Sequence, residues 1–295
     1  MRCRLVAELS EKAVTVGALC CVLGVSRSGY YGSRQRASSA TKICATSIQL
    51  KAEFAASGKD YGSRRLCAVL RSKGLHIGRY RVRRPMREQR LRALWRRKFI
   101  HTTDSGHALP VCDNVLARRF DPSGPNQAWV SDITYIRTRS GWLYLAVVLD
   151  LYARKVVGWA MAPSMHADLV CTALQLAITQ RQPSPGLIVH SDRGSQYASA
   201  LHQAMLARHG LVGGMSRKGN CWDNAVMERF FLSLKTERVW QRDYANHAEA
   251  MSDITGYILA FYNSVRLHSK LGNLPPNAFE QQSAINQPVA MSEKT

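Results

Sequence analysis

Residues 128–137 read Ala-Trp-Val-Ser-Asp-Ile-Thr-Tyr-Ile-Arg, and this apolar, β-branched stretch predicts a β-strand. Asp132 lies in the middle of the predicted strand. Buried strands disfavour aspartate, so its presence there needs a cause. Asp132 either bonds to a neighbouring turn at a sheet edge or contributes its carboxylate to a functional site.

Two further strands follow this one in the sequence, and after them helices and strands alternate. Residues 142–151 and 155–161 predict two more strands, which we expect to form a meander with the first. A helix with one apolar face follows, formed by Val170, Leu174, Ala177 and Ile178. Further elements are expected as a strand at 187–190, a helix at 198–208, an extended segment at 211–215 and a helix at 222–239. The order β-β-β-α-β-α-β-α predicts an α/β fold, with a mixed sheet flanked by helices.

Two further carboxylates occupy informative places in this pattern. Asp192 lies just past the strand 187–190, and Glu228 lies in the helix 222–239, with 35 residues between them. Functional residues of α/β sheets collect beyond the ends of strands. Taken singly, Asp192 could cap a turn or the next helix, and Glu228 could be an exposed helix acid.

Three carboxylates on converging elements suit a hard cation. Mg²⁺ prefers the oxygens of carboxylates, water and phosphate, and two ions about 3.5–4 Å apart can assist an in-line phosphoryl displacement. Strands and a helix hold such ligands more rigidly than loops do. Asp132, Asp192 and Glu228 together therefore predict a metal site for phosphoryl transfer.

The chain is strongly basic, and most of the excess charge lies in its first two-fifths. The 295 residues carry 41 Lys and Arg against 20 Asp and Glu, a net charge of +21. Residues 1–120 hold 25 of the basic and 7 of the acidic side chains, which leaves 16 and 13 for the rest. An excess of this size points to a polyanionic partner, most commonly nucleic acid.

The densest basic segment is 79–98, with ten basic side chains and one acid, Glu88. Such a segment can be a solvated helix face, but the apolar residues interleaved with the charges favour a phosphate-binding surface. The candidate DNA-contacting residues in it are Arg79, Arg83, Arg84, Arg87 and Arg90. Pro85 removes a helical hydrogen bond, so we expect this helix to be kinked or split there.

Two helix-turn-helix-like units are expected in the basic region. In the first, residues 1–35, Gly24 suits a helix end and Ser26 the next N-cap. In the second, residues 44–100, one helix ends at Lys73-Gly74 and a basic helix follows. The remainder is expected to divide into a linker at 101–124, a catalytic core at 125–240, a C-terminal helical segment at 241–282 and a tail at 283–295.

The sequence also argues against several classes of protein. The longest apolar run, residues 142–149, is far shorter than the ~18 residues of a membrane span, and the first residues do not form a secretory signal. None of the eight cysteines belongs to a CxxC pair, so neither a zinc module nor a disulfide framework is expected. We expect reduced thiols, a cytoplasmic protein and no membrane partner.

Long motifs around the three carboxylates resemble those of bacterial insertion-sequence transposases of the OrfB type. The first motif spans residues 129–136, the second 190–197, and the third 216–237. The similarity continues into 262–276 and extends back to 61–65, so it covers nearly the whole chain.

The resemblance implies a ribonuclease-H-like core, shared with retroviral integrases, with a DDE triad at Asp132, Asp192 and Glu228. It implies Mg²⁺ as the cofactor, with Mn²⁺ as a substitute, and two ions in the site. Lys235 lies two helical turns after Glu228 on the same face and would contact terminal DNA phosphates; the ordinary alternative is a solvated lysine. Asn224, one turn before Glu228, would orient that residue or cap the helix.

For function, the resemblance implies a transposase that cleaves the ends of an insertion sequence in double-stranded DNA and joins the freed 3′-hydroxyl to DNA. It also implies a homo-oligomer in a synaptic complex, an upstream OrfA protein or fusion as a further partner, and a place at the bacterial nucleoid. Two alternatives stay open on the sequence alone. One is a metal-dependent nuclease of the same fold, and the other is a DNA-binding regulator of transposition that does not cut.

Overall fold

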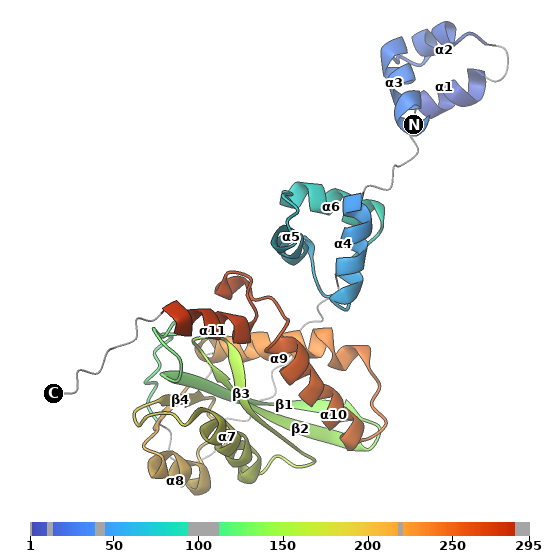
Figure 1. Cartoon of the computed structure of the whole chain (residues 1–295). Helices are drawn as coiled ribbons and strands as arrows, with labels where there is room; N and C mark the ends of the chain where they lie inside the picture. The colour runs from blue at the N-terminus through green and yellow to red at the C-terminus, as the bar shows by residue number, and fades with distance from the viewer. Residues whose placement is uncertain (1, 11–13, 39–44, 94–111, 218–220, 287–295) are drawn as a thin grey trace.

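The computed structural model describes residues 2–10, 14–38, 45–93, 112–217 and 221–286. Figure 1 shows two small helical groups followed by a larger domain in which helices cover a sheet. The helical groups comprise α1 (Arg2–Ser10), α2 (Val16–Val22), α3 (Arg27–Ser38), α4 (Ala45–Ala56), α5 (Ser63–Ser72) and α6 (Arg79–Glu88). The expected fold class, helical units before an α/β domain, is confirmed.

The first helical group, α1 to α3, packs around a small core that includes Val6, Leu19 and Tyr30. The turn after α2 contains Gly24, whose φ of 60° lies in the left-handed region that favours glycine. The Ser26 hydroxyl accepts a hydrogen bond from the N–H of Gly29 at 3.1 Å, as an N-cap residue does. Both turn residues therefore act as the sequence predicted.

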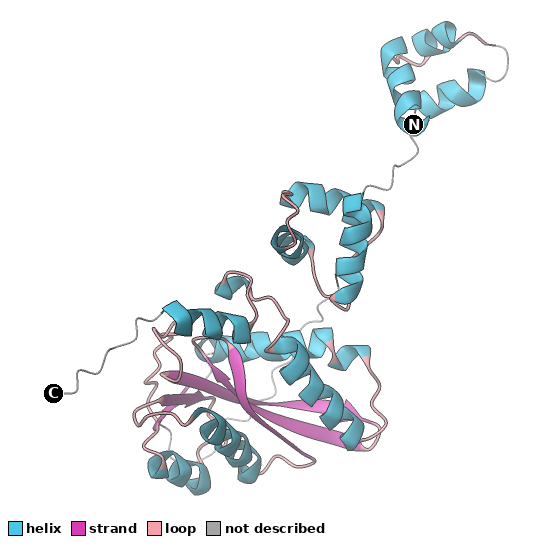
Figure 2. Ribbon diagram, viewed as in Figure 1, coloured by secondary structure: helices cyan, strands magenta, loops and turns pink. Residues whose placement is uncertain are grey.

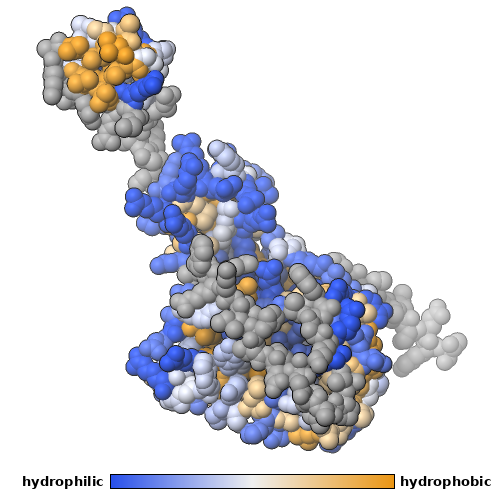
Figure 3. Space-filling view, turned by 180° about the vertical axis from the view of Figure 1, so that it is seen from behind, coloured by the Kyte–Doolittle hydropathy of each residue, from blue (hydrophilic) through white to orange (hydrophobic). Residues whose placement is uncertain are grey.

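The second helical group, α4 to α6, has its own core, which includes Leu50, Leu66, Leu70 and Val82. α5 ends at Ser72, and Gly74 follows with a φ of 82°. Figure 3 shows mostly hydrophilic side chains over this group, whereas apolar side chains gather on one face of the first group. The arginines of α6, among them Arg83, Arg84 and Arg87, are exposed.

α6 differs from the expectation at Pro85. The helix is not split there, because it runs from Arg79 to Glu88 with Pro85 inside it. Pro85 lies close to the C-terminal end of α6. Proline has no N–H, so the helix loses one hydrogen bond there. The carbonyl of Pro85 still accepts the N–H of Gln89 at 2.9 Å. The buried side chains of Val82 and Met86 hold the helix against the core on both sides of the proline.

The α/β domain is built on a five-stranded sheet in the order β3-β2-β1-β4-β5. Its strands are β1 (Ala128–Thr138), β2 (Gly141–Asp150), β3 (Lys155–Ala162), β4 (Ile188–Ser191) and β5 (Val212–Met215). β1, β2 and β3 form the expected antiparallel meander, and β4 and β5 extend the sheet in parallel from β1 (Figure 2). The mixed sheet predicted from the sequence is confirmed.

Helices cover both faces of this sheet. On one face, α7 (Ala167–Arg181) and α8 (Ala200–Arg208) pack over a core that includes Trp129, Val148 and Leu174. A Cβ at Gly158 of β3 would lie 2.3 Å from the carbonyl oxygen of Ala173, so the close approach of β3 to α7 requires glycine. On the other face lie α9 (Ala225–Glu237) and α10 (His247–Gly256), with a core that includes Val130, Leu145, Phe230 and Ile254.

The chain after α9 continues as short helical pieces. They are η2 (Val239–Gln241), α10, η3 (Tyr257–Tyr262), η4 (Ser269–Leu271) and α11 (Pro276–Asn286). Residues 283–286, expected to belong to a tail, are helical, because α11 continues to Asn286. Glu280 of α11 accepts a hydrogen bond from Lys155 of β3 at 2.7 Å and pairs with Arg181 of α7, and these contacts hold α11 against the domain.

Three expected features lie wholly or partly outside the described residues. They are the tail 287–295, the linker residues 101–111, and the last part of the basic segment, 94–98. Within the ranges that are described, none of the helices has the length and apolar character needed to cross a membrane.

Candidate active site

The strand register brings Asp132 and Asp192 to corresponding positions in the sheet. β1 and β4 run parallel, and their pairing ends with Val130 opposite His190. Asp132 follows two residues after Val130 within β1, and Asp192 follows two residues after His190, one position beyond the end of β4. Both carboxylates are half-buried, and they leave the paired part of the two strands at the same level.

Each aspartate also accepts a local backbone hydrogen bond. Oδ1 of Asp132 accepts the N–H of Ile133 at 2.7 Å, and Oδ1 of Asp192 accepts the N–H of Gly194 at 3.0 Å. Asp192 therefore does cap its own turn, which was one of its ordinary roles. These bonds fix the orientation of each carboxylate before any ligand arrives.

α9 brings the third carboxylate, Glu228, to this side of the sheet. The helix packs on the core through Met227, Phe230 and Leu234, so its position relative to β1 is set by buried apolar contacts. At the start of the helix, Nδ2 of Asn224 donates a hydrogen bond to Oδ2 of Asp132 at 3.0 Å. Glu228 lies one turn after this contact.

Of the two roles that the sequence suggested for Asn224, the cap hydrogen bond is contradicted, and the orientation of Glu228 stays a prediction. Asn224 occupies the N-cap position of α9 but makes no side-chain cap hydrogen bond. Its amide bonds to Asp132. α9 begins beside β1, so the amide N–H of Asn224 finds the Asp132 carboxylate as its acceptor.

The three carboxylates influence one another electrostatically. Burial raises the pKa of Asp132 well above its ordinary value, and the negative charges of Asp192 and Glu228 raise it further. The hydrogen bond from Ile133 and the positive charge of Lys235 act in the opposite direction. Asp192 and Glu228 thus lie near enough to Asp132 to influence its charge, and a metal site shared by the three acids stays a prediction.

Lys235 also influences the charge of Asp132 and is a buried residue. It is 8% exposed, and its Nζ lies 4.7 Å from the centroid of the Tyr135 ring on β1. Burial lowers the pKa of Lys235, and Asp132 opposes that change. The ordinary alternative of a solvated surface lysine does not fit these contacts. A role in DNA binding stays a prediction.

Asp223, an acid outside the predicted triad, organises the segment that leads into α9. Sequence reasoning missed it. Its side chain is 1% exposed, and its Oδ1 pairs with Nε of Arg118 at 2.8 Å. Its Oδ2 accepts the backbone N–H of Arg217 at 3.1 Å and the amide of Asn114 at 2.9 Å. The Trp-Asp-Asn sequence at 222–224 belongs to the third motif, which was the available signal.

Two polar pairs lie behind the aspartates. The hydroxyls of Ser131 and Tyr197 are 3.0 Å apart and buried, and Nε2 of His190 lies 3.1 Å from Oγ of Ser216. Burial lowers the pKa of His190 to about 4, so this imidazole is neutral at pH 7. The pairs connect β1, β4 and the end of β5, and they support the strands that carry the two aspartates.

The candidate DNA-contacting arginines lie in the second helical group. Arg83, Arg84, Arg87 and Arg90 are exposed, and Arg84 forms an ion pair with Glu88 at 2.9 Å. Arg79 hydrogen-bonds to Oγ of Ser63 at 3.4 Å and lines a cavity that also borders α9. The structure therefore brings Arg79, but none of the other four, to the lining of a cavity shared with the catalytic domain.

The three triad side chains are not arranged as a complete set of ligands around one metal ion. Across the described part of the chain, no group of three or more His, Cys, Asp and Glu side chains is arranged so that it could hold a metal ion. Mg²⁺ in phosphoryl-transfer sites is commonly held by one or two carboxylates together with phosphate oxygens and water. Such an ion does not need three preassembled protein ligands.

Models of protein families match both parts of the chain. A model of the integrase core domain matches residues 122–221, and a second model with the same description matches residues 211–276. A model of the HTH-like domain matches residues 46–99. The matches therefore cover the second helical group and most of the α/β domain.

Individual relatives agree with these matches. The insertion element IS600 uncharacterized 31 kDa protein of Shigella sonnei is 44% identical over 266 residues, which are 90% of this chain and 98% of the relative. The transposase InsF for insertion sequence IS3A of Escherichia coli K12 is 43% identical over 284 residues, 94% of this chain and 97% of the relative.

Solved structures give a more distant likeness. The catalytic core domain of HTLV-2 integrase, in complex with magnesium, is 14% identical and covers 54% of this chain and 98% of that chain, with a TM-score of 0.41. The family assignment rests instead on the relatives that match along almost their whole length. On that evidence the chain belongs to the IS3 family of insertion-sequence transposases and is a DNA transposase.

Proposed function

We propose that this transposase cleaves and joins DNA at a site formed by Asp132, Asp192 and Glu228. The observation that carries the proposal is the register of β1 and β4. Asp132 and Asp192 each lie two residues past the last paired residues of these parallel strands, and Glu228 lies in α9, which packs against β1. The hydrogen bond from Asn224 to Asp132 supports it, because that bond fixes the start of the helix against the strand.

The chemistry of this site fits Mg²⁺, or Mn²⁺ in its place. All three candidate ligands are carboxylates, the oxygen donors that hard cations prefer. Burial first, and then repulsion from Asp192 and Glu228, raises the pKa of Asp132, and a divalent cation would stabilise its ionised form. When bound, two such ions would stabilise the charge that develops on the attacking and leaving oxygens of a phosphoryl displacement.

The neighbouring residues of the chain would orient this site. Asn224 and the N–H of Ile133 hold the two oxygens of Asp132, and the N–H of Gly194 holds Asp192. Lys235 would hold a terminal DNA phosphate beside the carboxylates. In cleavage, a water oxygen bonds to phosphorus as the bond to the 3′-oxygen breaks. In joining, that 3′-hydroxyl oxygen bonds to phosphorus of the target and displaces another oxygen.

Binding of the DNA ends would involve the second helical group. The exposed arginines of α6 offer phosphate contacts that position a duplex, and the match to the HTH-like domain supports this assignment. We further propose a homo-oligomeric synaptic complex, an OrfA protein or fusion as a partner, and action at the nucleoid of a bacterial cell. These follow from the transposase family and its substrate.

The triad is tested by variants that remove charge at nearly constant shape. Asp132→Asn, Asp192→Asn and Glu228→Gln should each abolish cutting and joining of a labelled element end in Mg²⁺, while end binding and thermal unfolding change little. Asp168→Asn, an acid in the first turn of α7 on the opposite face of the sheet, is the matched control and should keep full activity.

Three outcomes would contradict parts of this proposal. Wild-type strand transfer by any triad variant would remove that residue from the mechanism. Cut products without joined products from the wild-type protein would indicate a nuclease. Binding without cutting would indicate a DNA-binding regulator.

A further inference from the structure

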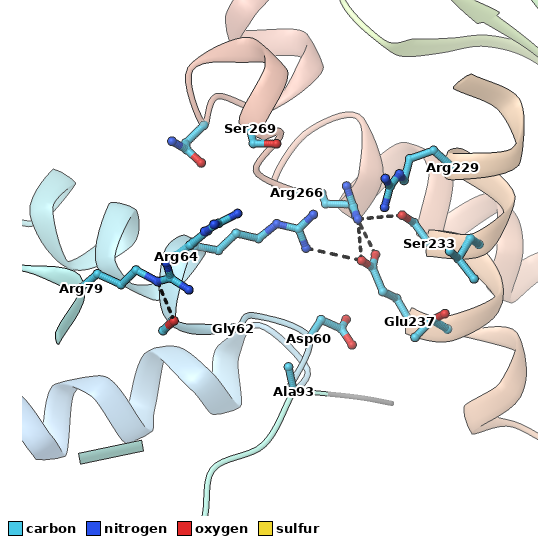
Figure 4. Close-up of a pocket in the computed structure, with 15 residues that line it drawn as sticks. Asp60, Gly62, Arg64, Arg79, Ala93, Arg229, Ser233, Glu237, Arg266 and Ser269 are labelled. Carbon is cyan, nitrogen blue, oxygen red and sulfur yellow. Dashed lines mark hydrogen bonds and ion pairs between the residues drawn. The ribbon is translucent and has the colours of Figure 1, made fainter. Parts of the chain in front are cut away.

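A cavity of about 440 Å³ lies between the second helical group and α9. Figure 4 shows that its lining comes from three parts of the chain: the α4–α6 group, the helix that carries Glu228, and the segment around Arg266 and Ser269. A cavity needs only ~10–15 Å³ of such volume to hold a single water molecule. The cavity is therefore large enough for a solvated group to enter.

The inner wall of this cavity is an ion-pair network that joins the two domains. Glu237 of α9 accepts hydrogen bonds from Nε and Nη2 of Arg266, at 2.7 and 2.6 Å, and lies 3.6 Å from Arg65 of α5. Beside it, the hydroxyl of Tyr61 accepts the N–H of Leu267 at 3.0 Å. These contacts fix the second helical group against the C-terminal end of α9.

The outer wall is different, because its arginines have no acidic partner. Arg64 and Arg229 are exposed, and among the described residues neither forms a hydrogen bond or an ion pair. Arg79 bonds only to the hydroxyl of Ser63 within that part of the chain. Figure 4 shows Arg64 and Arg79 on the side of the helical group and Arg229 on the side of α9.

The charges that line the cavity would attract an anion. Its lining includes five arginines, Arg64, Arg65, Arg79, Arg229 and Arg266, against the two acids Asp60 and Glu237, which is an excess of three positive charges. Like charges that converge from separate domains repel each other unless an anion lies between them. Guanidinium groups bind phosphate oxygens in a fixed, often bidentate geometry.

We propose that this cavity binds a backbone phosphate of the DNA through Arg64 and Arg79 on one side and Arg229 on the other. The inference rests on the proposed function, since it assigns a position to the duplex on which the site would act. Arg229 directly follows Glu228 in α9, so one duplex held in the cavity would contact the helix-turn-helix-like domain and the helix of the active site together. Ser269, which also lines the cavity, adds a hydroxyl donor.

The test uses the full chain and a DNA duplex of about 30 base pairs, roughly three helical turns. Arg64→Gln and Arg229→Gln should each lower the slope of log K against log salt by about 0.9, the value for one lost phosphate contact. Arg64→Lys and Arg229→Lys should keep the slope near wild type. Arg208→Gln removes an exposed charge from α8, outside the cavity, and should leave the slope unchanged.

The failure of this inference is distinguishable from failure of the proposed function. If both glutamine variants keep the wild-type slope while wild-type protein still cuts and joins ends, the cavity holds no DNA phosphate. The same conclusion follows if inorganic pyrophosphate binds the cavity arginines but the slopes for DNA do not change. Because Arg64 and Arg229 are exposed, thermal unfolding of the variants should match wild type and exclude misfolding as the cause.

Discussion

Nδ2 of Asn224 lies 3.0 Å from Oδ2 of Asp132, and this hydrogen bond joins the start of α9 to the middle of β1. Since Asp132 is surrounded by acids and by apolar packing, a donor aimed at its carboxylate favours the ionised form. The bond makes Asn224 a positioning residue for the proposed metal ligand. The effect of Asn224 on the pKa of Asp132 can be tested through the pH dependence of the reaction rate.

Asn224→Ala should raise the pKa of Asp132 further, because it removes a donor to the charged form. The acidic limb of the pH–rate profile, measured at sub-saturating Mg²⁺, should therefore move to higher pH. The value of kcat should fall roughly 10–100-fold, which corresponds to the loss of a charged hydrogen bond worth about 1.5–3 kcal/mol. Asn277→Ala in α11, which removes a hydrogen bond to Ser264, is the control. A lower unfolding midpoint with an unmoved acidic limb would mean that Asn224 is purely structural.

Lys235→Met should impair strand transfer without collapsing the fold. Methionine keeps an unbranched chain of similar length in the buried space beside Tyr135, while the positive charge disappears. We expect roughly a tenfold or greater loss of joining at physiological salt, and Lys235→Arg should keep much of the activity because charge and reach survive. Rates of joining for a pre-cleaved end measure this directly. Wild-type joining by Lys235→Met would remove Lys235 from the DNA-binding residues.

The local elements of the α/β domain could be predicted from the sequence, because each is encoded by its own periodicity. The strand expected at 155–161 is β3 (Lys155–Ala162), and the helix expected at 198–208 contains α8. The sequence also singles out three carboxylates by their places in its pattern, and their shared role stays a prediction. The parallel register of β1 and β4 accounts for the proximity of the two aspartates, and the packing of α9 on β1 accounts for that of Glu228.

Contacts between distant segments could not be predicted in this way. Helical spacing placed Lys235 on the face of Glu228, but its burial depends on Tyr135, one hundred positions earlier in the sequence. The partner of Asn224 depends on where α9 docks against β1. Continuity of α6 through Pro85 depends on the packing of Val82 and Met86, which outweighs the local effect of proline.

The arginines of α6 predict a steep salt dependence of DNA binding. Replacement of Arg83, Arg84, Arg87 and Arg90 by alanine should lower the slope of log K against log salt by up to about 0.9 per arginine. Arg84 should contribute least, because Glu88 already neutralises part of its charge. Arg208→Ala and Arg139→Ala, exposed on the α/β domain, provide matched controls. An unchanged slope in the fourfold variant would show that this face of α6 does not meet the duplex.

Asp60 makes the junction between the two domains sensitive to pH. Its Oδ1 is buried without a hydrogen-bond partner within the described residues, and burial, with the nearby charge of Glu237, raises its pKa to about 7. The unfolded chain has a value of about 3.9. Between these values the folded state holds a proton that the unfolded state has lost, so the contribution of Asp60 to stability decreases as pH rises from about 4 to 7.

Asp60→Asn should remove this pH dependence, because the amide keeps the shape of the carboxyl group and does not titrate. The free energy of unfolding of the variant, relative to wild type, should increase between pH 5 and pH 8, as measured by urea denaturation at both values. Asp243→Asn is the control: Asp243 is exposed and pairs with Arg139, which lowers its pKa, so it stays ionised across this range. An equal difference between Asp60→Asn and wild type at both pH values would show that Asp60 titrates in the folded protein as it does in the unfolded chain.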